Sequence, residues 1–270
     1  MATKWTKKRR VRRIQAVIFL IALAVFLFSG YQLLTIYLKY KQGSDEYDKL
    51  AGEAAKILSE AGGTTGAGGT GNAGKLEGTE NGEPGPWEEL YNLMRQENED
   101  YVGWITIEDT EIDYPIVQFT DNDYYLAHTF AGTENAAGTL FVDSNLPEGL
   151  ESKHAIVYGH NMKDGSMFAG LKKFREDDFY EGHKTFRVST KTGFYTYEIF
   201  SVSVISPDSD TYTLGFADDA EFLDYIARMK ERSLHNTGVT VDAEDRIITL
   251  STCVNKNVDR LVVQAKRLEN

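Results

Sequence analysis

The segment RIITLSTCVNKNVDRLVVQAKRL, residues 246–268, is the part of the sequence that decides the fold. Its two halves, RIITLST and RLVVQAKRL, are rich in β-branched and aliphatic residues, and a short polar stretch separates them. This is the pattern of two strands joined by a turn. In a hairpin, the last residue of one strand and the first of the next lie side by side at one rim. Those residues are Cys253 and Arg260, with VNKNVD between them, so the sequence predicts a thiol and a guanidinium facing one small volume.

Upstream of this hairpin, the chain contains further runs with the composition of strands, all after Trp87. They are GWITI, IDYPIVQ, GTLFVD, HAIVYGH, TFRVST and GFYTYEIFSVSVI. We expect an amphipathic helix, WEELYNLMRQEN, before them. Two helices are expected among them, SMFAGLKKF and DDAEFLDYIARMKERSLH, and the second opens with a capping box from Asp218 to Glu221. Short strands repeated in this way predict a mainly β fold, either a closed barrel or a sandwich.

His160 is a third residue that we expect at a rim, because it ends the HAIVYGH run where a loop begins. Cysteine, histidine and arginine together suit acyl transfer. The thiolate is the reactive form of cysteine, and a histidine can carry protons near neutral pH. Arginine stays charged and offers a fork of donors to an oxygen that becomes negative. The pattern indicates Cys253 as nucleophile, His160 as proton-transfer partner and Arg260 as the group that stabilises the transition state.

Cys253 is the only cysteine among the 270 residues, so the chain cannot form an internal disulfide. A lone thiol is either a small buried packing residue or a reactive group. Its place at the end of TLSTC, close in sequence to Arg260, favours the reactive interpretation.

Residues 1–38 predict a membrane anchor. They contain seven Lys or Arg and no Asp or Glu, and the basic cluster precedes 25 uncharged residues, 14–38. Such a stretch can span a hydrocarbon core of ~30 Å. A cleavable signal peptide is the alternative, because Ala22-Leu23-Ala24 resembles a cleavage site, but this triplet lies in the middle of the apolar run. The positive-inside rule then predicts a single-pass protein of the cell membrane with its catalytic domain outside.

Between the anchor and the strands, the chain predicts a juxtamembrane helix over residues 44–60 and then a flexible linker. Residues 61–86 hold ten glycines and two prolines, a composition with little to pack. Gly66, Gly68 and Gly71 match a dinucleotide-binding fingerprint, but no strand precedes them and no helix follows, so we take the match as chance. The expected domains are residues 1–38, 39–86 and 87–270.

The charge of the rest of the chain excludes one class of partner. Residues 39–270 carry 22 basic and 41 acidic side chains, a net charge of −19, which would repel the phosphates of nucleic acid. The remaining histidines show no metal-like pairing, and we expect them to be packing or surface residues: His128, His154, His183 and His235. We therefore expect neither a metal nor a cofactor.

Several segments resemble the sortase family, class B in particular: TLSTC with the downstream Arg260, VYGHNMKDGSMF around His160, and IDYPIVQ with DNDYYLAH. The resemblance covers residues 87–268, and it includes a helix over residues 218–233. It implies an eight-stranded β-barrel with a few helices. It also implies a membrane-anchored cysteine transpeptidase that cleaves a C-terminal sorting motif of secreted proteins after its Thr. The thioacyl group would then pass to an amine of the cell wall or of a pilin subunit.

The same resemblance assigns positions to the site. The family's catalytic residues correspond to His160, Cys253 and Arg260. The segments that line the class B substrate groove contain Asn122, Leu126, Tyr212 and Ser251. The interval of six residues between the cysteine and the arginine is shorter than in the best-known class B members.

Two other classes of function compete with this interpretation. Lys191-Thr192-Gly193 resembles one motif of penicillin-binding proteins, but the chain contains no S-x-x-K motif to supply the nucleophile. The alternative is a catalytically inactive adhesion or scaffold module tethered to the membrane, which the anchor and linker would serve equally well. That alternative does not account for a cysteine, a histidine and an arginine that all fall at strand ends, and it predicts a thiol indifferent to alkylation.

Overall fold

The computed structural model describes residues 2–60, 85–254 and 258–268. The chain forms two compact units, Met1–Asp45 and Glu46–Asn270. In its described residues the first unit is helical, whereas the second contains the β-sheet. The second unit begins well before residue 87, where the sequence alone places the start of the catalytic domain.

Helix α1 (Ala2–Glu60) joins two segments that the sequence analysis separates, the apolar run 14–38 and the charged helix 44–60. The residues between them include no proline, and the single glycine there, Gly43, costs a helix only ~1 kcal/mol. The helix therefore continues through this position. The expected linker and its fingerprint glycines lie almost wholly outside the described residues.

The apolar part of α1 is exposed within its unit. Phe26 is 73% exposed and Leu33 69% exposed. A stretch within Gln15–Ile57 is long and apolar enough to cross a membrane. Such exposure of large apolar side chains is what a lipid-facing helix presents.

The last turns of α1 behave differently, because they are packed into the second unit. Tyr47, Leu50 and Ala54 are each no more than 5% exposed. Their spacing of three and four residues places them on one face of the helix. This face is part of the hydrophobic core of the unit that carries the barrel.

The second unit contains eight strands that close into a barrel in the order β1-β2-β3-β4-β7-β8-β6-β5. Neighbours are antiparallel except for the parallel pairs β2–β3 and β4–β7. The strands are β1 (Tyr101–Thr106), β2 (Asp113–Val117), β3 (Leu140–Val142), β4 (His154–Tyr158), β5 (Thr185–Thr190), β6 (Gly193–Ile205), β7 (Ile247–Val254) and β8 (Asp259–Arg267). The predicted mainly β fold with an eight-stranded barrel is confirmed, and the closed ladder excludes the sandwich.

Short helical segments connect the strands. They are α2 (Pro86–Glu97), η1 (Tyr124–Leu126), η2 (Gly149–Glu151), η3 (Phe168–Arg175), α3 (Asp177–Gly182), η4 (Asp210–Tyr212) and α4 (Asp219–Glu231). The expected helix SMFAGLKKF forms the 3₁₀ helix η3, in which Gly170 lies so close to Thr110 that a Cβ atom would be 3.0 Å from its Cβ. Helix α4 begins with the predicted cap, since the Asp218 carboxylate accepts a hydrogen bond from the Glu221 N–H at 2.9 Å.

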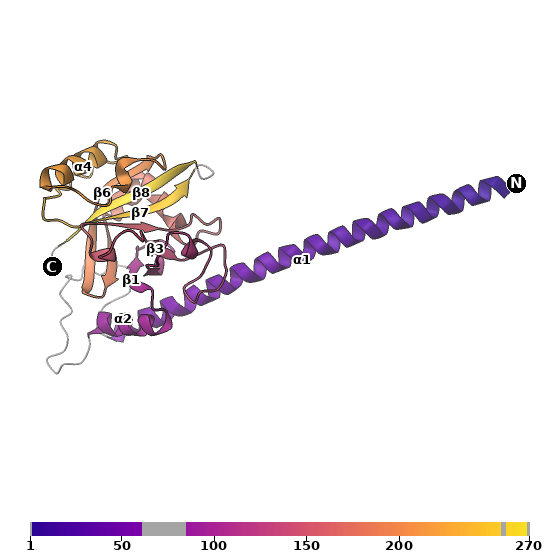
Figure 1. Cartoon of the computed structure of the whole chain (residues 1–270), viewed down its shortest axis with the longest axis horizontal. Helices are drawn as coiled ribbons and strands as arrows, with labels where there is room; N and C mark the ends of the chain where they lie inside the picture. Colours follow the sequence, from indigo (N-terminus) through magenta and orange to yellow (C-terminus); the bar gives the residue numbers. More distant parts are fainter. Residues whose placement is uncertain (1, 61–84, 255–257, 269–270) are drawn as a thin grey trace. The chain divides into compact units, whose positions relative to one another are not determined.

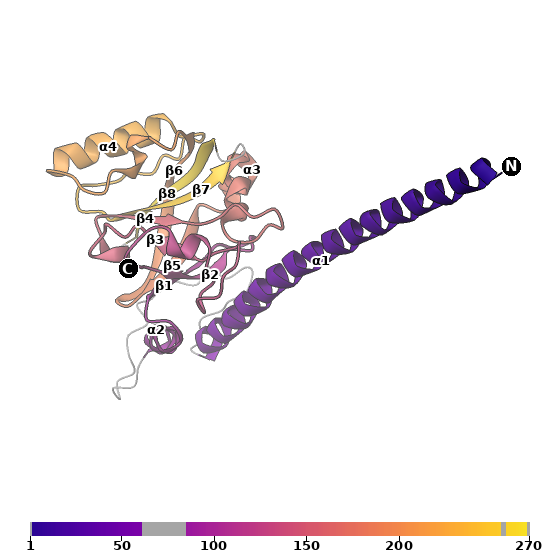
Figure 2. The same cartoon turned by 45° about the vertical axis from the view of Figure 1, so that its right-hand side comes forward.

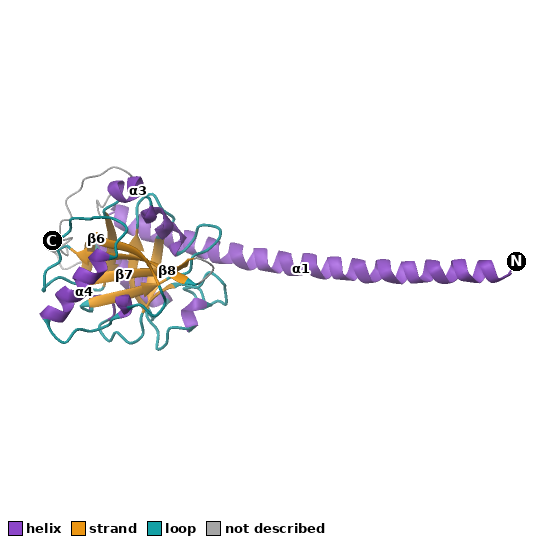
Figure 3. Ribbon diagram, turned by 90° about the horizontal axis from the view of Figure 1, so that it is seen from above, coloured by secondary structure: helices purple, strands orange, loops and turns teal. Residues whose placement is uncertain are grey.

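Helix α4 lies over the barrel beside β6 and β8 (Figures 1 and 2). Its inward face packs on β6 and on the beginning of β7, and the shared cluster is Phe200, Phe222, Tyr225, Ile226, Met229, Val241 and Ile247. Within this unit the strands gather in the middle, with helices and loops around them (Figure 3). The rim of the barrel where the sequence predicts the site residues is thus formed by strand ends that a buried core holds in place.

Candidate active site

The β7–β8 pair positions two of the three predicted catalytic residues. The strands are antiparallel, and Cys253 lies directly opposite Arg260 in their register. Directly opposite residues in such a pair project on the same face. The thiol and the guanidinium are therefore neighbours because of the ladder itself. The predicted hairpin geometry is confirmed, although residues 255–257 of its turn lie outside the described part of the chain.

His160 reaches the same rim from the end of β4. Strand β4 is parallel to β7, and Tyr158 lies beside Ser251 in their register. The ladder contact continues past the strand, because the Gly159 N–H donates to the Ser251 carbonyl oxygen at 3.1 Å. The Thr252 hydroxyl donates to the Gly159 carbonyl oxygen at 2.7 Å. The end of β4 is thus attached to the strand that carries the cysteine.

A glycine is needed just before the histidine. A Cβ atom at Gly159 would lie 2.7 Å from Phe168 Cδ2 and closer still to the Leu140 side chain. Real Cβ atoms do not approach other atoms so closely, so any other residue would push the strand end outward. On the far side of His160, Asn161 Nδ2 donates to the Cys253 carbonyl oxygen at 2.6 Å. Both neighbours of His160 thus bind β7.

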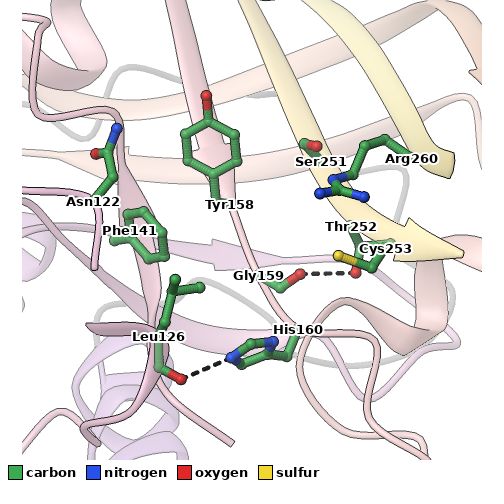
Figure 4. Close-up of a pocket in the computed structure, with 10 residues that line it drawn as sticks. All are labelled: Asn122, Leu126, Phe141, Tyr158, Gly159, His160, Ser251, Thr252, Cys253 and Arg260. Carbon is green, nitrogen blue, oxygen red and sulfur yellow. Dashed lines mark hydrogen bonds between the residues drawn. The ribbon is translucent and has the colours of Figure 1, made fainter. Parts of the chain in front are cut away.

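The imidazole of His160 is oriented by a backbone carbonyl. Its Nε2 lies 2.7 Å from the carbonyl oxygen of Leu126, at the end of η1. A carbonyl oxygen can only accept, so Nε2 carries a proton, and in the neutral ring Nδ1 is then the unprotonated nitrogen. Figure 4 shows this second ring nitrogen on the side of the ring that faces Cys253.

One pocket collects most of the predicted site residues. It is lined by Asn122, Leu126, Phe141, Tyr158, Gly159, His160, Ser251, Thr252, Cys253 and Arg260 (Figure 4). Six of the seven predicted positions are therefore together. The seventh, Tyr212, is outside the lining, but its hydroxyl contacts the Ser251 hydroxyl at 2.8 Å.

Four lining residues were not predicted. Gly159 and Thr252 are sequence neighbours of His160 and Cys253, so adjacency to the predicted residues was a usable signal. Tyr158 also adjoins the histidine, and its ring stands 5.4 Å from that of Phe141 in β3. Nothing in the sequence of β3 distinguishes Phe141 from an ordinary core residue.

Two neutral phenols lie at the site, Tyr158 in the pocket lining and Tyr212 behind Ser251. The Tyr158 hydroxyl donates to the Asp143 carboxylate at 3.0 Å. Burial raises the pKa of Tyr158, and the charge of Asp143 raises it further. Burial likewise raises the pKa of Tyr212. Both side chains therefore stay uncharged at neutral pH, so the thiol and the guanidinium have neutral hydroxyls nearby.

Buried hydrogen bonds from His154 and Tyr225 hold the backbone next to Tyr212. His154 is fully buried, with Nδ1 2.7 Å from the Thr213 carbonyl oxygen and Nε2 2.7 Å from the Thr249 hydroxyl. On the other side of Tyr212, the Tyr225 hydroxyl donates to the Thr211 carbonyl oxygen at 2.9 Å. The backbone on both sides of Tyr212 is thereby anchored. Burial lowers the pKa of His154 to about 4, so its ring is neutral.

The other histidines have structural contacts of the kind expected. His128 stacks on Tyr124 with ring centroids 4.0 Å apart, and His235 stacks on Tyr180 at 4.5 Å. His183 Nε2 lies 2.8 Å from Asp109. Among the residues whose side chains the structure describes, no group of three His, Cys, Asp or Glu could hold a metal ion.

The chain is similar to known proteins in both sequence and fold. A sortase domain model matches residues 105–268. Sortase B of Listeria monocytogenes is 38% identical over 250 residues, which is 92% of this chain and 94% of that protein. The Staphylococcus aureus sortase B–substrate complex is 26% identical with a TM-score of 0.72, covering 86% of this chain and 99% of that one. Sortase B from B. anthracis in complex with AAEK1 is 33% identical with a TM-score of 0.69, covering 87% and 100%.

These relatives and the rim of the barrel together define a cysteine transpeptidase. The chain belongs to the sortase family, and the predicted resemblance to class B is confirmed.

Proposed function

We propose that this sortase cleaves a C-terminal sorting motif of secreted proteins after its Thr and transfers the acyl group to an amine of the cell wall or of a pilin subunit. Cys253 is the nucleophile, His160 moves the protons and Arg260 stabilises the negative oxygen. The observation that supports these roles is the pairing of Cys253 with Arg260 across the β7–β8 ladder, with His160 lining the same pocket.

In the first half-reaction the thiolate of Cys253 attacks the carbonyl carbon of the motif's Thr. The carbonyl oxygen becomes negative in the tetrahedral intermediate, and the guanidinium of Arg260 donates hydrogen bonds to it. The C–N bond then breaks. Protonated Nδ1 of His160 gives its proton to the departing amine, and a thioester remains on Cys253.

In the second half-reaction an incoming amine attacks the thioester carbonyl. Nδ1 of His160, now unprotonated, takes the proton from this amine, and the C–S bond breaks to return the thiolate. The Leu126 carbonyl supports both steps, because it holds the Nε2 proton and leaves Nδ1 for the exchange. The histidine thus serves once as acid and once as base at the same nitrogen.

The pocket wall supplies the substrate-binding residues of the proposal. Ser251 and Tyr212 share a hydroxyl contact next to the cysteine strand, which gives a substrate backbone a pair of polar partners. Asn122 is oriented by the Ser144 N–H, which donates to its Oδ1 at 2.8 Å. Leu126 is 39% exposed and offers an apolar surface at the mouth. The Staphylococcus aureus relative has been solved as a substrate complex, which supports the binding of a substrate by this chain.

The test is adduct formation with a panel of motif peptides. The full chain in detergent micelles is incubated with NPxTN-like and LPxTG-like peptides and analysed by mass spectrometry, with and without an added amine such as triglycine. The expected result is a thioester on Cys253 for one motif, released as a peptide–amine conjugate. An enzyme that forms no adduct with any peptide, and whose thiol resists alkylation, would favour the adhesion or scaffold module instead.

We further propose that α1 anchors the protein in the membrane with its N-terminus in the cytoplasm. The support is the exposed apolar stretch that follows the basic cluster. Protease added to intact protoplasts should release a fragment that contains residues 87–270. Protection of that fragment would reverse the topology.

A further inference from the structure

The end of α1 makes polar contacts with the loop that follows η1. Tyr47 is 5% exposed, and its hydroxyl donates to the Gly138 carbonyl oxygen at 2.5 Å. The same hydroxyl lies 3.0 Å from the Thr139 hydroxyl. One residue earlier in the helix, Glu46 Oε1 accepts a hydrogen bond from the Ala131 N–H at 2.8 Å. A helix that packed only for its apolar face would need none of these bonds.

The loop that Tyr47 holds lies directly against the carbonyl that orients the histidine. A Cβ atom at Gly138 would lie 3.0 Å from the Leu126 carbonyl oxygen, and Gly138 has a φ of +60°, which favours glycine. The Thr139 N–H donates to the Tyr125 carbonyl oxygen at 2.9 Å. The segments around Leu126 and Gly138 are therefore in backbone contact, so a shift of one moves the other.

A second series of contacts connects the Tyr47 ring with the backbone carbonyl of His160. Its ring packs edge-on against Tyr114, with centroids 5.3 Å apart. The Tyr114 hydroxyl accepts a hydrogen bond from the Met167 N–H at 3.3 Å. Met167 has a φ of 53°, which is uncommon for a residue with a side chain and is maintained only by its surroundings. It lies next to Phe168, whose N–H donates to the His160 carbonyl oxygen at 2.9 Å.

From this convergence we infer that Tyr47 is a positioning residue for His160. Its hydroxyl holds the loop behind the Leu126 carbonyl, and its ring supports the Tyr114 contact with the loop that begins at His160. Among the buried residues of the last turns of α1, Tyr47 is thus the one that links the helix to the histidine. The inference rests on the proposed function insofar as it takes His160 as the proton-transfer residue.

The experiment compares two variants of the full chain in micelles. Tyr47→Phe removes the hydroxyl but leaves the ring on Tyr114, whereas Leu50→Ala weakens the packing of the same helix and touches none of these bonds. With a reactive peptide, Tyr47→Phe should lower kcat about fivefold, which corresponds to the loss of one hydrogen bond, with KM within twofold of the wild type. Leu50→Ala should lower Tm by more than Tyr47→Phe, yet keep kcat when the assay is run well below Tm.

A readout on the resting enzyme separates this inference from the proposed function. The ¹⁵N shifts of the imidazole, assigned by comparison with His160→Gln, report which ring nitrogen carries the proton. At a pH at which the ring is neutral, the wild type should hold the Nε2–H form, and Tyr47→Phe should populate the Nδ1–H form as well. Unchanged shifts in Tyr47→Phe, or a kcat that merely follows Tm in both variants, would overturn the positioning role. This measurement needs no substrate, so it decides the inference even if every peptide fails to react.

A double-mutant cycle gives an independent check. Thr139→Val removes the hydroxyl that lies next to that of Tyr47 in the same loop. If both act through the loop behind the Leu126 carbonyl, the kcat of the double variant should be close to that of Tyr47→Phe alone. Additive losses in kcat would contradict a shared path.

Discussion

Cys253 and Arg260 lie opposite each other in one β-ladder, whereas the ring of His160 depends on segments that are far apart in the chain. The first pair is placed by the register of two adjacent strands, which a single local pattern specifies. The histidine needs the end of β4, the carbonyl of Leu126 and the loop behind it. The positions of Cys253 and Arg260 should therefore resist substitutions elsewhere in the chain. The orientation of the His160 ring, in contrast, should respond to substitutions in distant segments.

The largest effect on activity is expected from a substitution of Cys253. Cys253→Ala should abolish the thioacyl adduct, because no other thiol exists in the chain. The fold should be kept, since the register of β7 and β8 comes from backbone bonds. Mass spectrometry of the adduct and a thermal melt measure the two properties. An adduct that persists in this variant would mean that another residue is the nucleophile.

Substitutions of Arg260 test whether this residue acts through directed hydrogen bonds or only through its charge. Arg260→Lys should be nearly as damaging as Arg260→Ala, with a loss of about a hundredfold in turnover, because a flexible ammonium cannot replace a rigid planar fork of donors. If the residue acted only through its charge on the thiol, lysine would restore most of the turnover. The pH dependence of Cys253 alkylation in both variants distinguishes the two accounts.

Tyr212 is outside the pocket lining, and a variant of it tests its proposed role in substrate binding. Tyr212→Phe removes the hydroxyl that contacts Ser251, and it should raise KM for the peptide about fivefold with little change in kcat. Ser251→Ala should give a similar increase, and the two changes together should not be additive. A fall in kcat with KM unchanged would instead assign Tyr212 to the chemical step.

The smallest effect on turnover is expected for His154, which acts on stability. Its pKa is about 4 in the folded protein and ~6.5 in the unfolded chain. Above pH ~6.5 both forms are neutral, and stability is independent of this residue's titration. As pH falls from ~6.5 to ~4, the unfolded chain binds a proton that the folded one does not. The free energy of unfolding should therefore decrease, by about 3 kcal/mol over the whole window.

The control for this prediction is His154→Asn, which keeps a donor near the Thr213 carbonyl but cannot titrate. Urea unfolding at pH 5 and pH 7.5 should show a smaller difference in this variant than in the wild type. An equal difference in both proteins would assign the acid sensitivity to other groups.

Helix α1 was predicted only in part from the sequence. The sequence predicts the apolar run and the short charged helix separately, and the structure joins both in one continuous helix. Tyr47, Leu50 and Ala54 have the spacing of a buried face, yet three residues in a charged stretch are a weak signal. What they pack against lies many residues further along the chain, and no local pattern reports that.

In the pocket, the side chains could be predicted from the sequence, but one backbone group could not. Cys253 and His160 carry their chemistry in their side chains, so residue type and strand position were enough to select them. Leu126 was selected as a lining side chain, but its carbonyl is the group that orients the imidazole. Every residue has a carbonyl, and only the path of the backbone makes that of Leu126 the acceptor for the imidazole of His160.

Local order along the chain was therefore sufficient for the strands, the hairpin and the pairing of thiol with guanidinium, because alternation and turn length act over a few residues. Contacts between distant segments determine three other features: the closure of the barrel, the hydrogen bond that orients the His160 ring, and the burial of Tyr47. Such contacts depend on the whole packed core, whose geometry no short stretch of sequence contains.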